Sequence, residues 1–324
     1  MTAEFFAASN VLIVAGKGGV GKTTVGASLG IAAARSGYDV LLVELEGHSN
    51  LATLFDVEQL SYEEVTIDLR EIGADPTTGE ATTGPHGVGR LRARQLRPDD
   101  ALTDYLDRAG LGPLTSRLAN SGAMDVVVTA APGIRDLLTL GKIRQLEQAG
   151  SADLIVVDAP AAGHALTFLT AAAGLASSAS SGPVRDQADL VLEMFADDRR
   201  CQVVLVTLPE ETPITETIET AFSLEEDVGI KLAPVVVNGV WPAIDGLADA
   251  VASIDRRGAD RRRTPASSSD RALVDAAGYR LARIEDQEAE MARLAAELPL
   301  EQVRLPFLFR TELGRSGIGE LAGS

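Results

Sequence analysis

The sequence contains very little cysteine and very little lysine. Its 324 residues include one cysteine, Cys201. A single cysteine excludes an intramolecular disulfide, a CxxC zinc clip and a cysteine-held iron–sulfur cluster. Only four of the 29 basic residues are lysine, and the other 25 are arginine. The four lysines are Lys17, Lys22, Lys142 and Lys231, and the first two belong to one glycine-rich loop.

Positive charge, leader-like sequence and long apolar runs are also scarce. The 47 acidic residues outnumber the basic ones and give a net charge of −18, which disfavours nucleic acid as a partner. The first ten residues have no basic region and carry Glu4, unlike a signal peptide. The longest uncharged stretch, 165–184, is diluted by Ser, Thr, Gly and Pro183, so no integral membrane segment is expected. A cytoplasmic location is predicted, with peripheral membrane contact through a partner as the alternative.

A phosphate-binding motif follows the first apolar segment. The run VLIVA, residues 11–15, predicts a buried strand, and GKGGVGKTT after it matches GxxxxGK(S/T). Backbone N–H groups in such a loop can point at phosphate oxygens, beside the N-terminus of the helix expected up to Gly37. Lys22 supplies a charge for the β- and γ-phosphates, and the Thr23 hydroxyl a ligand for Mg²⁺. ATP and Mg²⁺ are therefore the predicted cofactors. The loop residues expected to bind them are Gly16, Lys17, Gly18, Gly19, Val20, Gly21, Lys22, Thr23 and Thr24.

Acidic residues follow two further predicted strands. The strand 40–43 runs into Glu44 and Glu46, which are two residues apart and so face the same side of an extended chain. A later apolar strand ends in Asp158, in the position of a carboxylate that holds Mg²⁺ through its water shell. The carboxyl ends of parallel strands lie at one edge of the sheet, where ligands bind.

These segments together resemble a known family. GKGGVGKTT, with lysine directly after the first glycine, is similar to the deviant Walker A loop of the ArsA, Get3, MinD and ParA ATPases. DAPAAGHAL, residues 158–166, and APGIRD, residues 131–136, resemble segments of ArsA and Get3. The GHxL run within the first of these segments is absent from MinD and ParA relatives. The chain thus resembles the ArsA/Get3-type P-loop ATPases. Within this group it most resembles the single-domain actinobacterial ArsA-like (anion-transporting ATPase) proteins, whose LLVExEG stretch carries the same glutamates.

The resemblance implies roles for individual residues. Lys17 would reach the nucleotide of a partner subunit, and Glu46 would position the attacking water where relatives carry aspartate. The expected catalytic residues are then Lys17, Lys22 and Glu46. His164 is a candidate reporter of the γ-phosphate, with a loop-packing histidine as the alternative.

The resemblance also implies an adenine site late in the chain. Asn238, at the end of a predicted strand, corresponds to an asparagine that contacts the adenine edge. RLPFLFRTELG, residues 304–314, resembles the family's adenine loop, with Pro306 and Phe307 flanking the ring.

The implied fold is an α/β P-loop NTPase with a mostly parallel central sheet flanked by helices, plus a helical insert. We expect one domain over residues 1–324, with a nucleotide core at about 10–160 and 200–315 and the insert at about 160–200. A flexible Arg/Ser linker is expected at 255–270 and a long amphipathic helix at 270–298. Arg90, Arg92 and Arg94 alternate as on one strand face, which predicts a charge-guarded edge strand or an anionic docking edge.

The leading functional hypothesis is an ATP-hydrolysing dimeric switch, either a homodimer or a heterodimer with a paralogous ATPase. Its helical surface, with 165–184 as a candidate groove, would bind a protein client or membrane partner that the sequence does not identify. With only Cys201, neither the cysteine cluster of ArsA nor the zinc site of Get3 can form. One alternative is a nucleotide-gated chaperone or scaffold with negligible hydrolysis, suggested by glutamate at position 46. Another is a positioning ATPase like ParA or MinD, although residues 311–324 lack a basic amphipathic helix.

Overall fold

The chain folds around one extended sheet. Its architecture comes from a computed structural model, which describes residues 3–45, 50–72, 89–108, 133–160, 163–258 and 268–324. The strand order is β3-β4-β2-β5-β1-β6-β8-β9, with β7 paired to β6. All of these pairings are parallel except that of β3 with β4. The strands are β1 (Val11–Ala15), β2 (Val40–Leu45), β3 (Val65–Ile67), β4 (Leu91–Leu96), β5 (Leu154–Asp158), β6 (Cys201–Thr207), β7 (Lys231–Leu232), β8 (Val235–Val240) and β9 (Gln302–Pro306).

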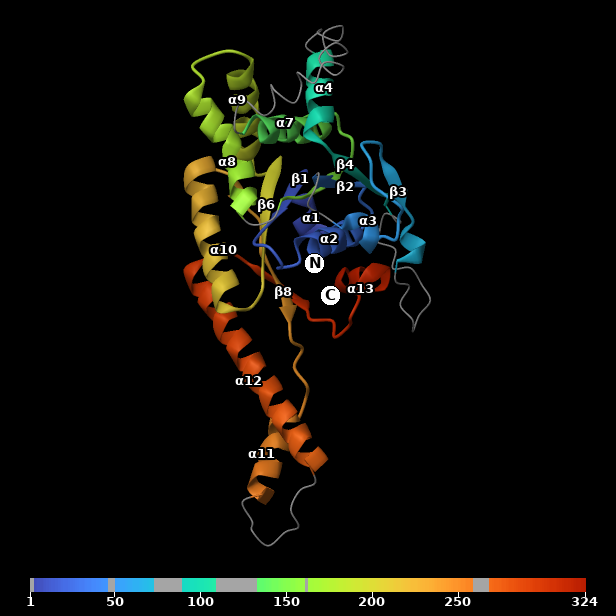
Figure 1. Ribbon diagram of the computed structural model, residues 1–324, viewed down its shortest axis with the longest axis vertical. Coiled ribbons are helices and arrows are strands. Elements are labelled where there is room, and N and C mark those ends of the chain that lie inside the picture. Colours follow the sequence, from blue (N-terminus) through green and yellow to red (C-terminus); the bar gives the residue numbers. More distant parts are fainter. Residues whose placement is uncertain (1–2, 46–49, 73–88, 109–132, 161–162, 259–267) are drawn as a thin grey trace.

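Helices cover both faces of this sheet (Figure 1). Along β1, Val11, Ile13 and Ala15 pack on the face covered by α7 to α10 and α12, whereas Leu12 and Val14 pack under α2 and α13. The predicted α/β fold with a mostly parallel sheet is therefore confirmed. The helices are α1 (Ala3–Ala7), α2 (Lys22–Arg35), α3 (Leu51–Leu54), α4 (Pro98–Arg108), α7 (Ile134–Gln148), α8 (Gly163–Ser178), α9 (Pro183–Ala196), α10 (Glu211–Ser223), α11 (Leu247–Gly258), α12 (Ser268–Glu297) and α13 (Gly314–Leu321).

The arginine-bearing strand β4 is not at the edge of the sheet, so that prediction was wrong. It lies between β2 and β3, and the short strand β3 forms the edge. Arg92 is ion-paired with Asp39 and Glu64, and Arg94 lies 3.7 Å from Glu64 and over the ring of Tyr62. These partners offset the free-energy cost of removing the guanidinium charges from water, so a strand in the interior of the sheet can carry arginine.

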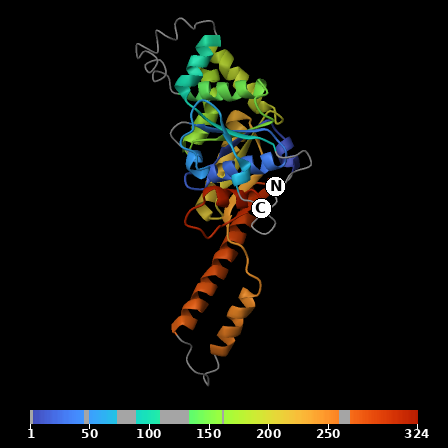
Figure 2. The ribbon, with the colours of Figure 1, turned by 90° about the vertical axis from the view of Figure 1, so that its right-hand side faces the viewer.

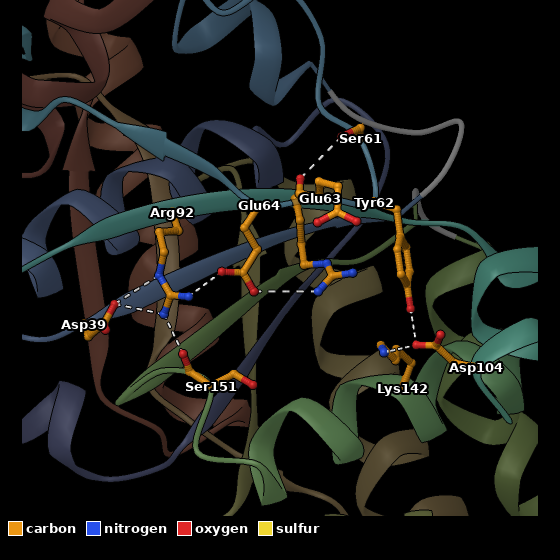
Figure 3. A network of polar contacts seen from close by, with 10 residues as sticks. Asp39, Ser61, Tyr62, Glu63, Glu64, Arg92, Asp104, Lys142 and Ser151 are labelled. Atoms are coloured by element: carbon orange, nitrogen blue, oxygen red, sulfur yellow. Dashed lines mark hydrogen bonds and ion pairs between the residues drawn. The ribbon is translucent and has the colours of Figure 1, made fainter. Parts of the chain in front are cut away.

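The same network reaches the helices beside the sheet (Figure 3). The Tyr62 hydroxyl and the Lys142 ammonium both donate to the carboxylate of Asp104 on α4. Burial and the neighbouring Asp104 raise the pKa of Tyr62 well above its ordinary value. Lys142 on α7 thus has a structural partner, and the network ties β4 and the segment before β3 to α4 and α7.

Helices α11 and α12 form a hairpin that projects from the body, at the end opposite α4, α7 and α9 (Figures 1 and 2). The amphipathic helix predicted at 270–298 is confirmed as α12. Helix also extends into the predicted linker 255–270, because α11 continues to Gly258 and α12 begins at Ser268. The intervening residues 259–267 lie outside the described part of the chain.

The first part of the uncharged segment 165–184 packs into the core. On α8, Ala165, Phe168, Leu169 and Ala172 are at most 3% exposed and belong to the cluster under the sheet. Val184, at the end of the segment, is 36% exposed, but most exposed apolar side chains lie elsewhere. Of the eight large ones among the described residues, six lie on the hairpin or its root: Ile244, Ile254, Leu273, Tyr279, Phe307 and Phe309.

None of the helices in the described ranges combines the length and the apolar composition needed to cross a bilayer.

The two halves of α12 should contribute unequally to stability. Leu294 is completely buried in the main core, whereas Leu273 on the projecting part is 70% exposed. We expect Leu294→Ala to lower the free energy of unfolding by about 2–5 kcal/mol, because it leaves a cavity among packed side chains. Leu273→Ala is the matched control and should change it by less than about 0.5 kcal/mol. Chemical denaturation followed by circular dichroism measures both, and equal losses would contradict the described packing.

Candidate nucleotide-binding site

The glycine-rich loop joins the carboxyl end of β1 to the first residue of α2, Lys22. Gly16, Gly19 and Gly21 have φ values of 147°, 85° and 91°, which side-chain-bearing residues rarely adopt. A Cβ atom on Gly16 would stand 2.3 Å from the carbonyl oxygen of Val206 on β6. The loop therefore keeps its close contact with the sheet only with glycine at this position. Thr24 follows in the first turn of α2.

Lys22 is buried at the base of the loop. Its side chain is 8% exposed, and its Nζ donates a hydrogen bond of 2.9 Å to the carbonyl oxygen of Lys17. Burial lowers the pKa of Lys22, and the nearby Asp158 carboxylate opposes that change. The ammonium is thus held by one backbone oxygen that a phosphate oxygen can replace.

Thr23 and Asp158 are brought together as the motif predicted. The Thr23 hydroxyl donates to Oδ2 of Asp158 across 2.7 Å. Glu44, which is 5% exposed, lies directly opposite Asp158 in the pairing of β2 with β5. Hydroxyl and carboxylate oxygens are ligands that Mg²⁺ accepts, usually with several waters and substrate phosphates completing its shell. The donor set at this end of the sheet therefore fits Mg²⁺.

Within the described ranges, no group of three or more His, Cys, Asp or Glu side chains is placed to hold a metal ion on its own.

Lys17 makes a contact that the sequence did not predict. Its Nζ lies 2.8 Å from Oε1 of Glu216 on α10. The two side chains are 40% and 28% exposed. The lysine next to the first glycine is therefore bound within its own chain by a helix that follows β6.

Asn238 lies beside the loop, and Phe307 lies beside the strand that carries Asn238. The Asn238 amide, at the end of β8, donates a hydrogen bond of 2.9 Å to the Val20 carbonyl oxygen. The Phe307 N–H, just after Pro306, donates to the carbonyl of Val240 across 2.8 Å. The β8 and β9 residues expected to contact adenine are thus brought together, and Asn238 also supports the loop.

Phe307 belongs to an aromatic cluster that sequence reasoning missed in part. Its ring centroid is 4.8 Å from that of Phe309 and 6.1 Å from that of Trp241. The guanidinium of Arg280 lies over both Trp241 and Phe309. The sequence signal for this cluster is weak because its members come from three separate segments.

Two predicted residues cannot be placed. Glu46 lies outside the described residues, and the side chain of His164, at the start of α8, is likewise not described.

The fold and the loop define a P-loop nucleotide-binding protein of the α/β class. The chain belongs to the ArsA_ATPase family, described as anion-transporting ATPase, whose sequence profile matches residues 9–181. The predicted family is therefore confirmed.

Individual relatives agree with this assignment. The chain is 34% identical to ATPase BagA of Mycobacterium tuberculosis over 238 residues, covering 71% of this chain and 65% of the relative. It is 27% identical to an arsenical pump-driving ATPase of Escherichia coli over 265 residues, covering 75% and 41%. It is 24% identical to ATPase GET3B of Arabidopsis thaliana over 267 residues, covering 71% and 64%. Each match spans less than two thirds of the relative's own length.

The close approach of the loop to β6 can be tested with two glycines. We expect Gly16→Ala to lower the free energy of unfolding by about 1–3 kcal/mol, because the new methyl group would meet a backbone oxygen and strain the loop. A methyl group on Gly18 would meet no atom of the described residues within 4 Å, so Gly18→Ala is the control and should be nearly neutral. Thermal unfolding of both variants measures the difference. A neutral Gly16→Ala would show that the loop does not contact β6 as described.

Proposed function

We propose that this chain is a cytoplasmic ATPase that binds ATP and Mg²⁺ at the loop 16–24 and hydrolyses the terminal phosphoanhydride bond as a dimer. The observation that carries the proposal is the hydrogen bond between Thr23 and Asp158 beside the buried Lys22. A phosphate-binding lysine and two oxygen ligands for a cation converge at the ends of β1 and β5. Membership of an ATPase family supports the same chemistry.

Lys22 and the loop would hold the triphosphate. The ammonium exchanges the Lys17 carbonyl for β- and γ-phosphate oxygens, while the loop N–H groups and the N-terminus of α2 bind the remaining oxygens. Mg²⁺ would supply charge neutralisation at these oxygens when bound. Thr23 would ligate the ion and Asp158 would accept hydrogen bonds from its water shell. Glu46 would orient the attacking water.

Lys17 would complete the site of a second subunit. Its position after the first glycine motivates the proposal, as does the 40% exposure of its side chain, in contrast to the buried Lys22. The second subunit is either another copy or a paralogous ATPase. In such a dimer Lys17 stabilises charge on the transferring phosphate from across the interface.

We expect the nucleotide state of this ATPase to change a helical surface that binds a partner. The α11–α12 hairpin is a better candidate than α8, since α8 buries its apolar face whereas the hairpin and its root carry six exposed large apolar side chains. The hairpin follows β8 in the chain, and Asn238 of β8 contacts the loop, so β8 connects the loop to the root of the hairpin.

The four lysines allow a direct test of the two loop roles. Lys22→Ala should abolish ATP binding, because the phosphates lose their buried cation. Lys17→Ala should leave ATP binding by the monomer nearly unchanged but lower kcat by about 10³-fold or more and weaken ATP-dependent dimers. Equilibrium binding of a fluorescent ATP analogue, phosphate release and sedimentation velocity measure these effects.

The exposed Lys231 on β7 provides the matched control. Lys231→Ala should change none of the three measurements. A Lys17→Ala protein with normal hydrolysis would exclude the role of Lys17 in the partner's site.

A substitution of Glu46 distinguishes the enzyme hypothesis from that of a nucleotide-gated scaffold. If Glu46 orients water, Glu46→Ala should lower the hydrolysis rate by about 10²-fold or more while leaving ATP binding intact, since a misplaced water reacts slowly. Single-turnover hydrolysis at saturating ATP and Mg²⁺ measures this rate. Wild-type turnover no faster than that of Glu46→Ala would reject the enzyme and favour the scaffold.

A further inference from the structure

Residue 17 is held at two points within its own chain. Its ammonium is ion-paired with Glu216 at 2.8 Å, and its carbonyl oxygen accepts the hydrogen bond from Lys22. Both the side chain and the backbone of Lys17 are therefore engaged by the subunit that carries them.

The helix that carries Glu216 is fixed in place. Ile214 and Ala221 of α10 are fully buried in the main core. In addition, Arg293 of α12 donates to the Glu211 carbonyl and the Thr215 hydroxyl at 3.0 and 3.1 Å. Because core packing and these hydrogen bonds both anchor α10, the helix presents the Glu216 carboxylate to the loop at a defined position.

We propose that Glu216 is a latch that retains Lys17 within its own subunit and so opposes dimer closure. This inference rests on the proposed function, in which Lys17 acts at the partner's nucleotide. An ammonium in contact with Glu216 cannot at the same time reach a phosphate in another subunit. Glu216 is thus a positioning residue that sets when Lys17 becomes available.

Binding of phosphate by Lys22 weakens the latch. When the Lys22 ammonium moves to the phosphates, the Lys17 carbonyl loses that hydrogen bond, while the ion pair with Glu216 still holds the Lys17 side chain. A partly exposed ion pair of this kind changes an equilibrium by about two- to fivefold. The latch is therefore weak enough for nucleotide contacts to release it.

Lysine reactivity tests the latch without any dimer. The protein without nucleotide is acetylated briefly with an N-hydroxysuccinimide ester, and each lysine is quantified by peptide mass spectrometry. Glu216→Gln should speed acetylation of Lys17 by about two- to fivefold, because the ammonium is no longer held against a carboxylate. Glu219→Gln, an exposed position on the same helix, should have no effect. The exposed Lys231 and the buried Lys142 are internal references. Unchanged Lys17 reactivity in Glu216→Gln would overturn the latch.

The affinity of the ATP-dependent dimer tests the consequence of the latch. With Mg²⁺ and a non-hydrolysable ATP analogue, Glu216→Gln should tighten the dimer by about two- to fivefold, and the change should vanish in a Lys17→Ala background. A wild-type dimer that depends on Lys17 but is not tightened by Glu216→Gln overturns the latch alone. A wild-type chain that does not dimerise with the analogue overturns the proposed function and the latch with it.

Discussion

The hydrogen bond between Thr23 and Asp158 is the contact on which the arrangement of the site depends. It joins residues 135 positions apart, one in the first turn of α2 and one at the end of β5. Because β1 and β5 are neighbouring parallel strands, the loop after β1 and the carboxylate ending β5 reach the same edge of the sheet. The rest of the site follows from this edge: Lys22 lies beneath the loop, Asn238 supports it from β8, and Glu44 stands beside Asp158 on β2.

Features encoded in short stretches of sequence were predictable. A short apolar run rich in β-branched residues favours an interior strand that is buried on both faces, and Val11–Ala15 is such a strand with the predicted bounds. The loop motif and the acidic end of a later strand predicted that Thr23 and Asp158 would lie near one Mg²⁺ site, and the two side chains are hydrogen-bonded. Contacts between distant side chains were not predictable, because no local pattern relates Lys17 to Glu216 or Trp241 to Phe309. The prediction that β4 lies at the edge of the sheet failed for the same reason, since the partners of its arginines, Asp39 and Glu64, come from other segments.

Arginine and lysine make different kinds of contact in this chain. Arginine makes the structural ion pairs that join separate elements, such as Arg200 with Glu147 and Arg304 with Glu288. Lysine occurs in the loop, where a compact charge on a flexible stem can exchange one partner for another. The other two lysines lie outside the loop: Lys142 is buried beside Asp104 and the ring of Tyr62, and Lys231 is exposed on β7. The two loop positions are thus the ones where lysine, and not the far more abundant arginine, faces the proposed phosphate site.

Helix α12 is continuous from the core to the projecting hairpin. It first meets the body near Tyr279 and Arg280, which pack on Trp241, and its later residues Met291 and Leu294 are buried. Residues 268–278 therefore form an arm about 16 Å long at 1.5 Å per residue. Turning the packed end by about 10° would carry the far end through about 3 Å. Because Arg293 on the packed end also binds α10, a small rotation of α10 would be enlarged along this arm before it reached the far end of the hairpin.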